Sequence, residues 1–110
     1  YNKNDRHILI VENNGAIANM QDDAMVEVVC ELGINGPRPM RVGNIPQFNL
    51  GLLVNQVSCE KLIVDAYYEH SYEKALQAFT LNRLVGDAKK ARKVLDALIE
   101  ANKGMWPELK

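Results

Sequence analysis

The spacing of apolar residues changes at Pro46, and this change constrains the fold of the chain more than any other feature. Before Pro46, the segment Ala24–Glu31 alternates with period 2, which places Val26, Val28 and Cys30 on one face of a half-buried strand. After Pro46, apolar residues recur every three or four positions, the period of a helix. The sequence therefore predicts an α+β fold in which the strands come first.

The first part of the chain carries the signals of strands joined by tight turns. Ile8–Val11 is a short run rich in β-branched residues, and it is followed by Asn13–Gly15, whose residue types tolerate a positive φ angle. Asn35-Gly36 stands between apolar runs, and this dipeptide is a strong hairpin signal. These turns predict that the strands pair antiparallel.

Two prolines restrict the strand that returns from this hairpin. Proline has no backbone N–H to donate, so Pro37 and Pro39 limit the strand to a sheet edge or to its own first residues. We place the return strand at Met40–Val42. The sheet as a whole is predicted over residues 7–43.

The second part of the chain predicts helices over residues 46–68, 72–81 and 87–103. Pro46 suits a first helical turn, Ser71 is the expected N-cap of the second helix, and Gly104 is the expected stop of the third. The apolar arc of the first helix is wide. We therefore expect that helix to be buried on more than one side.

Charge and cysteine usage exclude several classes of protein. A net charge of −1 gives no basic field for nucleic acid, and no apolar run approaches the ~20 residues of a membrane span. Cys30 and Cys59 form no disulfide framework, which favours a reducing, cytoplasmic setting. Together with His7 and His70 they lack the spacing of a metal site, so we expect buried cysteines and a capping or surface His70.

The charged clusters of the chain are expected to be structural. Asp22 and Asp23 suit a turn, and Glu27 and Glu31 are expected to be solvated unless their strand face lines a cleft. The basic run Lys89–Lys93 is expected to be a solvated helix face. No phosphate-binding glycine pattern or catalytic triad is evident. The residues alone define no enzyme site.

Several stretches nevertheless resemble glycoside hydrolase family 4. Residues 13–28 are similar to the family peptide NNGAI-x-x-L-x-DD-x-VVEV. Further matches follow in the same order along the family, at Gly36–Pro39, Val42-Gly43, Glu60–Ala66, Ala75–Ala78, Asn82–Asp87 and Leu95–Lys103. Within the family, Gly36–Pro39 and Leu84–Asp87 are most similar to the 6-phospho-β-glucosidases, and the 6-phospho-α-glucosidase and α-galactosidase branches stay open.

The resemblance implies a cytoplasmic, NAD-dependent and homo-oligomeric glycosidase that acts on a small phosphorylated sugar. Such enzymes also use a divalent metal such as manganese, and they are an exception to two-carboxylate glycoside hydrolysis. It further implies the carboxyl-terminal domain of a lactate/malate dehydrogenase-like fold. The family's glycine-rich loop, metal-holding cysteine and histidine, tyrosine base and phosphate-binding arginine all precede the part that resembles this chain.

We therefore expect residues 1–110 to be one carboxyl-terminal domain of a longer enzyme, without its NAD-binding domain. The polar start Tyr1–Arg6 lacks the apolar core of a signal peptide and fits a cut through a longer chain. We transfer no catalytic, cofactor-binding or metal-binding role onto any residue, and the chain by itself is expected to be inactive.

The sequence departs from the family peptides at a few positions and leaves two other classes of protein open. Glu12, Val29 and the pair Met20-Gln21 depart from positions where the family carries proline or Leu-Pro. One alternative is a stand-alone interaction module that uses the apolar arc of residues 50–66. The other is the carboxyl-terminal half of a nicotinamide-dependent 2-hydroxy-acid dehydrogenase, for which neither histidine has a matching context.

Overall fold

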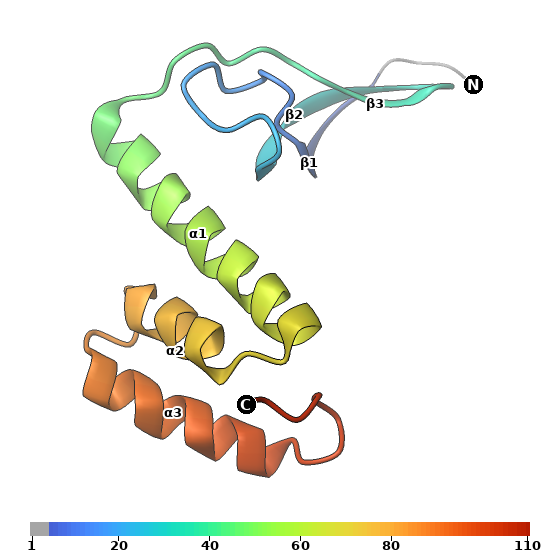
Figure 1. Ribbon diagram of the computed structural model, residues 1–110. Helices are drawn as coiled ribbons and strands as arrows, with labels where there is room; N and C mark the ends of the chain where they lie inside the picture. The colour runs from blue at the N-terminus through green and yellow to red at the C-terminus, as the bar shows by residue number, and fades with distance from the viewer. Residues whose placement is uncertain (1–4) are drawn as a thin grey trace. The chain divides into compact units, whose positions relative to one another are not determined.

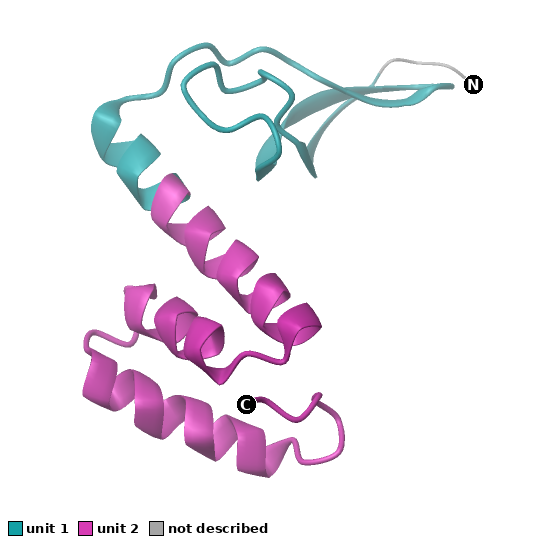
Figure 2. Cartoon of the chain, in the orientation of Figure 1, with its two compact units in different colours: residues 1–53 teal, residues 54–110 magenta. Residues whose placement is uncertain are grey.

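The computed structural model describes residues 5–110, and the start of the polar segment, residues 1–4, lies outside the described part. Strands precede helices along the chain, which confirms the predicted α+β class (Figure 1). The chain divides into two compact units, residues 1–53 and residues 54–110 (Figure 2). Each unit is described by itself, and the expectation of one domain over residues 1–110 stays a prediction.

The first unit is built on a three-stranded antiparallel sheet with the order β1-β2-β3. Its strands are β1 (Asp5–Glu12), β2 (Met25–Gly33) and β3 (Gly36–Pro39). The predicted alternation in β2 is confirmed, because Val26, Val28 and Cys30 are buried on one face. The turn after β1 is confirmed as well, with φ values of 42° at Asn14 and 79° at Gly15.

The position predicted for the return strand was wrong, although its place at the sheet edge was right. β3 spans Gly36–Pro39 and contains both prolines, whereas we had placed the strand at Met40–Val42. The N–H of Met40 donates to the carbonyl of Val29 at 2.9 Å. Donors that face the partner strand alternate along a strand, so Pro37 and Pro39 occupy positions whose nitrogen faces away from β2. The edge strand therefore loses no donor to either proline.

The second unit is built from three helices and ends in a tail, residues 102–110. The helices are α1 (Gln47–Glu69), whose first residues belong to the first unit, α2 (Tyr72–Leu81) and α3 (Ala88–Ala101). Each lies within two residues of its predicted bounds. The Ser71 hydroxyl accepts from the N–H of Lys74, as expected of an N-cap, and Asp87 caps α3 in the same way through Lys90.

The core of the second unit is small. Ala66 from α1, Ala75 from α2 and Leu95 from α3 are buried together, with further apolar side chains packed around them. The tail joins this core through Leu109, and its backbone pairs with the α1–α2 turn, where Lys110 donates to His70 and Tyr72 donates to Lys110. The tail is thus an integral part of the unit.

The expectation that α1 is buried on more than one side is confirmed, although the burial is incomplete. Its buried residues are Val57, Cys59 and Ala66, while large apolar side chains such as Phe48 and Tyr68 are exposed. Val57 lies on the opposite side of the helix from Cys59 and Ala66, because each residue advances about 100° around the helix axis. The described residues therefore cover α1 from two sides and leave the rest of its apolar arc exposed.

Candidate functional site

The cysteines and histidines do not assemble into a metal site. Among residues 5–110, no three His, Cys, Asp or Glu side chains are grouped so that they could hold a metal ion. Cys30 and Cys59 are free and buried, which confirms the interpretation of both as small core residues. Burial raises the pKa of the Cys59 thiol, so this group is less ready to ionise than an exposed cysteine. His70 is exposed at the end of α1, as expected of a surface histidine.

One pairing in the sheet was not predicted. His7 on β1 stands directly opposite Cys30 on β2, so their side chains share one face of the sheet. The Cys30 thiol donates to the Val28 carbonyl at 3.6 Å, and His7 is exposed. Two potential ligands do not complete a metal site, and this pair carries no catalytic assignment. Sequence reasoning missed it because strand register cannot be read from spacing alone.

The loop between β1 and β2 is organised by a single buried side chain, that of Asn13. Its amide nitrogen lies 3.0 Å, 3.2 Å and 3.0 Å from the carbonyl oxygens of Ile17, Met20 and Gln21. Its side-chain oxygen accepts from the Ile17 N–H at 2.7 Å. Asn13 is fully buried, so these bonds are shielded from water. The sequence marked Asn13 only as a turn residue.

The acidic residues of this region behave as turn and surface groups. The carbonyl of Asp22 accepts from the N–H of Asn14 at 2.9 Å, which confirms a turn role for the paired aspartates. Glu27 is exposed, as expected. Glu31 is not freely solvated as we predicted, because Arg6 lies 3.6 Å from one of its oxygens and Arg38 donates to the other. The hydrogen bond and charge of Arg38 lower the pKa of this carboxyl.

The other face of the sheet carries an uncovered apolar patch. Ile8 and Ile10 from β1 and Met25 and Val29 from β2 point to the face opposite the buried residues. Ile8 and Ile10 are 66% and 69% exposed, and Ile8 stands directly opposite Val29. A sheet with apolar residues on both faces is typical of a sheet that packs against a partner on each side.

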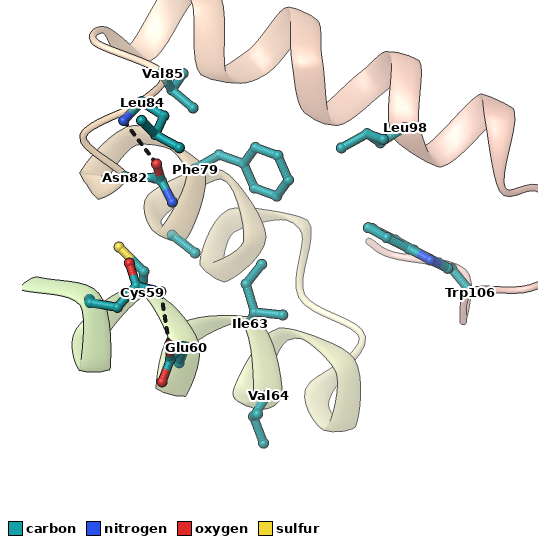
Figure 3. A pocket seen from close by; sticks show the side chains of 12 residues that line it. Cys59, Glu60, Ile63, Val64, Phe79, Asn82, Leu84, Val85, Leu98 and Trp106 are labelled. Carbon is teal, nitrogen blue, oxygen red and sulfur yellow. Dashed lines mark hydrogen bonds between the residues drawn. The ribbon is translucent and has the colours of Figure 1, made fainter. Parts of the chain in front are cut away.

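The helical unit contains an open apolar groove with a volume of about 670 Å³ (Figure 3). Its walls come from α1, α2, the α2–α3 loop, α3 and the tail. They consist of Gln56, Cys59, Glu60, Ile63, Val64, Ala78, Phe79, Asn82, Leu84, Val85, Leu98 and Trp106. No lysine or arginine belongs to this lining, and Glu60 is its one charged residue.

Two polar side chains of the lining are held by hydrogen bonds. Gln56 donates to the Glu60 carboxylate at 2.8 Å, and the N–H of Leu84 donates to the Asn82 side-chain oxygen at 3.0 Å. The rest of the lining is mostly apolar, so the groove offers mainly apolar contact area.

Two polar contacts tie the helices of this unit together. The Tyr72 hydroxyl donates to Asp96 on α3 at 2.7 Å, which raises the pKa of the phenol. Lys74 lies 2.6 Å from Glu69 and 3.3 Å from Asp65, and these acceptors raise the pKa of its ammonium group. The basic run Lys89–Lys93 is exposed except for Ala91, which confirms a solvated face on α3.

The sheet face and the groove both expose apolar side chains to solvent. Comparison with known proteins shows to which family the chain belongs. Residues 1–85 match the family model described as "Family 4 glycosyl hydrolase C-terminal domain". The chain therefore belongs to the family 4 glycosyl hydrolases.

Individual members of the family differ in how similar they are to this chain. The chain is 56% identical over 109 residues to "Maltose-6'-phosphate glucosidase" of Bacillus subtilis, covering 99% of this chain and 24% of that protein. It is 40% identical over 96 residues to "Probable 6-phospho-beta-glucosidase" of the same organism, covering 87% of this chain and 22% of the relative. The chain thus spans about a quarter of the length of the curated relatives it matches.

A solved structure agrees in both fold and sequence. The crystal structure of a 6-phospho-alpha-glucosidase from gut microorganisms, in complex with NAD and Mn²⁺, superimposes with a TM-score of 0.96 at 82% identity. The match covers 100% of this chain and 25% of that one. Relatives named for the α linkage are thus more similar to this chain than the relative named for the β linkage, which runs against the β branch that the family peptides favoured.

The residues of this chain do not themselves fit the two groups held by that relative. Within residues 5–110 no cluster of potential ligands could hold manganese, and the sequence contains no G-x-G-x-x-G pattern for a dinucleotide. No helix in the described part of the chain is long and apolar enough to cross a membrane.

Proposed function

We propose that this chain is the carboxyl-terminal part of an NAD- and manganese-dependent 6-phospho-α-glucosidase that acts on small phosphorylated α-glucosides. The observation that carries the proposal is similarity to proteins named for this activity over nearly all of this chain, at 56% and 82% sequence identity. The relative named for the β linkage is 40% identical to this chain. The α reading replaces the β reading that the family peptides favoured. The phosphorylated substrate places the parent enzyme in the cytoplasm.

Within that enzyme the chain has a structural role, and none of its residues is catalytic. The apolar outer face of the sheet, centred on Ile8 and Ile10, packs against the part of the enzyme that binds NAD. The buried side chain of Asn13 fixes the conformation of the β1–β2 loop through its hydrogen bonds. Support comes from the described residues: their buried side-chain nitrogens and oxygens all have hydrogen-bond partners, while many of their large apolar side chains are exposed.

Exchange of the matching quarter between enzymes tests this role. This chain replaces the matching quarter of the Bacillus subtilis maltose-6'-phosphate glucosidase, and in parallel that of the β-named relative of the same organism. Each host with its own quarter rejoined at the same junction is the control. Activity is measured with chromogenic 6-phospho-α- and 6-phospho-β-glucosides, NAD and manganese.

The proposal predicts that the α host recovers a far larger share of its control activity than the β host. The chain alone and each host without its quarter should show no turnover above the reagent blank. Turnover by the isolated chain would refute the non-catalytic role. Better recovery in the β host would refute the α linkage.

A further inference from the structure

The sequence contains two Asn-Gly pairs, and both lie in turns of the first unit. Asn14-Gly15 follows β1, and Asn35-Gly36 belongs to the turn between β2 and β3. An asparagine that precedes glycine is open to a reaction with its own backbone, because glycine has no Cβ to hinder the approach of its nitrogen. The two pairs therefore carry the same chemistry in different surroundings.

The reaction is loss of ammonia followed by addition of water. The glycine nitrogen attacks the side-chain carbonyl carbon (Cγ) of the asparagine and forms a new C–N bond. The side-chain nitrogen leaves as ammonia and takes the proton of the glycine N–H. Water then opens the resulting succinimide ring at one of its two carbonyls, which gives aspartate or isoaspartate. Either product adds one negative charge, and the reaction needs no oxidant, reductant or cofactor.

Asn14 lies in a turn that resists opening. Ring closure rotates the backbone of the asparagine, so the rate depends on how easily its turn opens. The Asn14 N–H donates to the carbonyl of Asp22 at 2.9 Å, and the Asn14 side-chain amide donates to the Glu12 carboxylate at 3.2 Å. The preceding residue, Asn13, is fully buried and holds both the N–H and the carbonyl of Ile17. Opening at Asn14 therefore breaks hydrogen bonds that are shielded from water.

Asn35 lies at the tip of a hairpin that has few such restraints. Ile34 and Asn35 are both exposed, and the Asn35 side chain makes no hydrogen bond within residues 5–110. Gly33 and Gly36 are the last residues paired across this hairpin, and β3 is a four-residue strand at the sheet edge. Glycine gains more backbone freedom on opening than any other residue. The tip therefore opens by releasing one terminal pair of the sheet.

We propose that Asn35 is a site of spontaneous deamidation, and that Asn14 is protected from the same reaction by the buried Asn13. The substrate is the side-chain amide of the protein itself, and water is the co-reactant. The isoaspartyl product inserts a methylene into the backbone of the turn, so the turn no longer matches the pairing of Gly33 with Gly36. The inference goes beyond the proposed function and depends on neither the sugar nor the linkage.

Peptide mass spectrometry of aged protein tests the proposal. The samples are the chain by itself and the full-length Bacillus subtilis host that carries this chain, both incubated at neutral pH. Cleavage after glutamate separates the two sites, because Glu27 and Glu31 lie between them. The gain of about 1 Da should appear at least about fivefold faster at Asn35 than at Asn14 in both samples. In concentrated urea, where both turns are unfolded, the two rates should agree within about threefold.

Two variants test the cause of the difference. Asn13→Ala should raise the rate at Asn14 at least about fivefold, and it should leave the rate at Asn35 within about twofold of its original value. Asn35→Gln is the matched control, because the longer side chain would have to close a six-membered ring. It should remove the mass gain from the hairpin peptide and leave the rate at Asn14 unchanged.

The order of the two rates decides the outcome. Equal rates in the absence of urea, or a faster reaction at Asn14, would overturn the proposal. A rate at Asn14 that does not respond to Asn13→Ala would overturn it as well, because the protection would then have another source. The readout is mass and not turnover. An exchanged host without activity therefore counts against the proposed function and leaves this inference intact.

Discussion

Removal of the Asn13 side chain should destabilise the first unit more than removal of any other polar side chain in the β1–β2 loop. Asn13→Ala removes the two amide N–H groups that three carbonyls share and leaves the Ile17 N–H without its acceptor. A buried bond contributes about 1 kcal/mol net, and a stranded buried donor costs about 1–3 kcal/mol. Carbonyls near the loop surface regain water, so we expect a total loss of about 3 kcal/mol.

The aspartate variant at the same position sharpens the argument. In Asn13→Asp a carboxylate replaces the amide that faces the carbonyls of Ile17, Met20 and Gln21, so acceptor meets acceptor. Burial and these carbonyls hold the pKa of the new carboxyl above its ordinary value in the folded state. A raised folded pKa means that the folded state binds the proton more tightly, so stability falls as pH rises. The aspartate variant should therefore be less stable than the alanine variant at pH 7 and should recover as the pH is lowered.

Hydrogen exchange of the Val42 amide is the measurement that reports on this loop. That N–H donates to the Ala16 carbonyl at 2.8 Å, next to the turn that Asn13 organises. A loss of about 3 kcal/mol lowers its protection about 100-fold. Asn14→Gly is the control, because Asn14 is exposed and glycine accepts its positive φ angle. A decrease of less than about fivefold in Asn13→Ala, or one no larger than in the control, would refute the reasoning.

Three further predictions concern single side chains. Arg38→Ala should raise the pKa of Glu31 in a carboxyl NMR titration. A lowered folded-state pKa stabilises the fold at pH values above the ordinary glutamate range, and this stability is lost as the pH falls. The stability of the variant should therefore depend less on pH in that range. His70→Gly should raise stability by about 0.5–1 kcal/mol in thermal melts, because His70 has a φ of 56°, and His70→Val should lower it. Asp87→Ala should cost about 1 kcal/mol of stability, measured by denaturation followed through tryptophan fluorescence, with Asp87→Asn close to wild type, because its carboxylate accepts from the N–H of Lys90 at 2.8 Å.

The helices could be predicted closely because their signals are local. A serine at position 71, an acidic residue in the first turn and a regular apolar stripe are all present within a few residues, and they define α2 at Tyr72–Leu81 without reference to the rest of the fold. The same holds for α3, where Asp87 supplies the cap. Such features stabilise a helix relative to the unfolded chain, whatever tertiary contacts the helix makes.

The edge strand was misplaced because its signal depends on a register that is not local. Pro37 and Pro39 read as breakers when each is judged by its missing N–H. Their two-residue spacing puts both nitrogens on the same side of β3, and the pairing with Leu32 and Cys30 decides that this side faces away from β2. Only the register, which couples residues far apart in the chain, distinguishes a tolerated proline from a disruptive one.

The groove could not be predicted as a site for a related reason. Its walls come from α1, α2, the following loop, α3 and the tail. These segments are spread over residues 56–106, and no sequence motif links them. The one signal in the sequence was the wide apolar arc of α1, from which we expected burial on more than one side or, as an alternative, an interaction surface over residues 50–66. An apolar pattern predicts that a surface is buried. It does not predict whether that surface is buried by the same unit or by a partner.

Buried polar groups and exposed apolar groups differ sharply in this chain. Within residues 5–110 every buried side-chain nitrogen and oxygen has a hydrogen-bond partner. Large apolar side chains on the sheet, on α1 and around the groove are at the same time left to solvent. Exposed apolar area of this extent costs free energy in an isolated chain and is recovered when a partner covers it. A catalytic part would show the opposite balance, with unpaired or strained polar groups inside an apolar enclosure. The balance in this chain supports the proposal that the chain contributes contact surfaces to a longer enzyme.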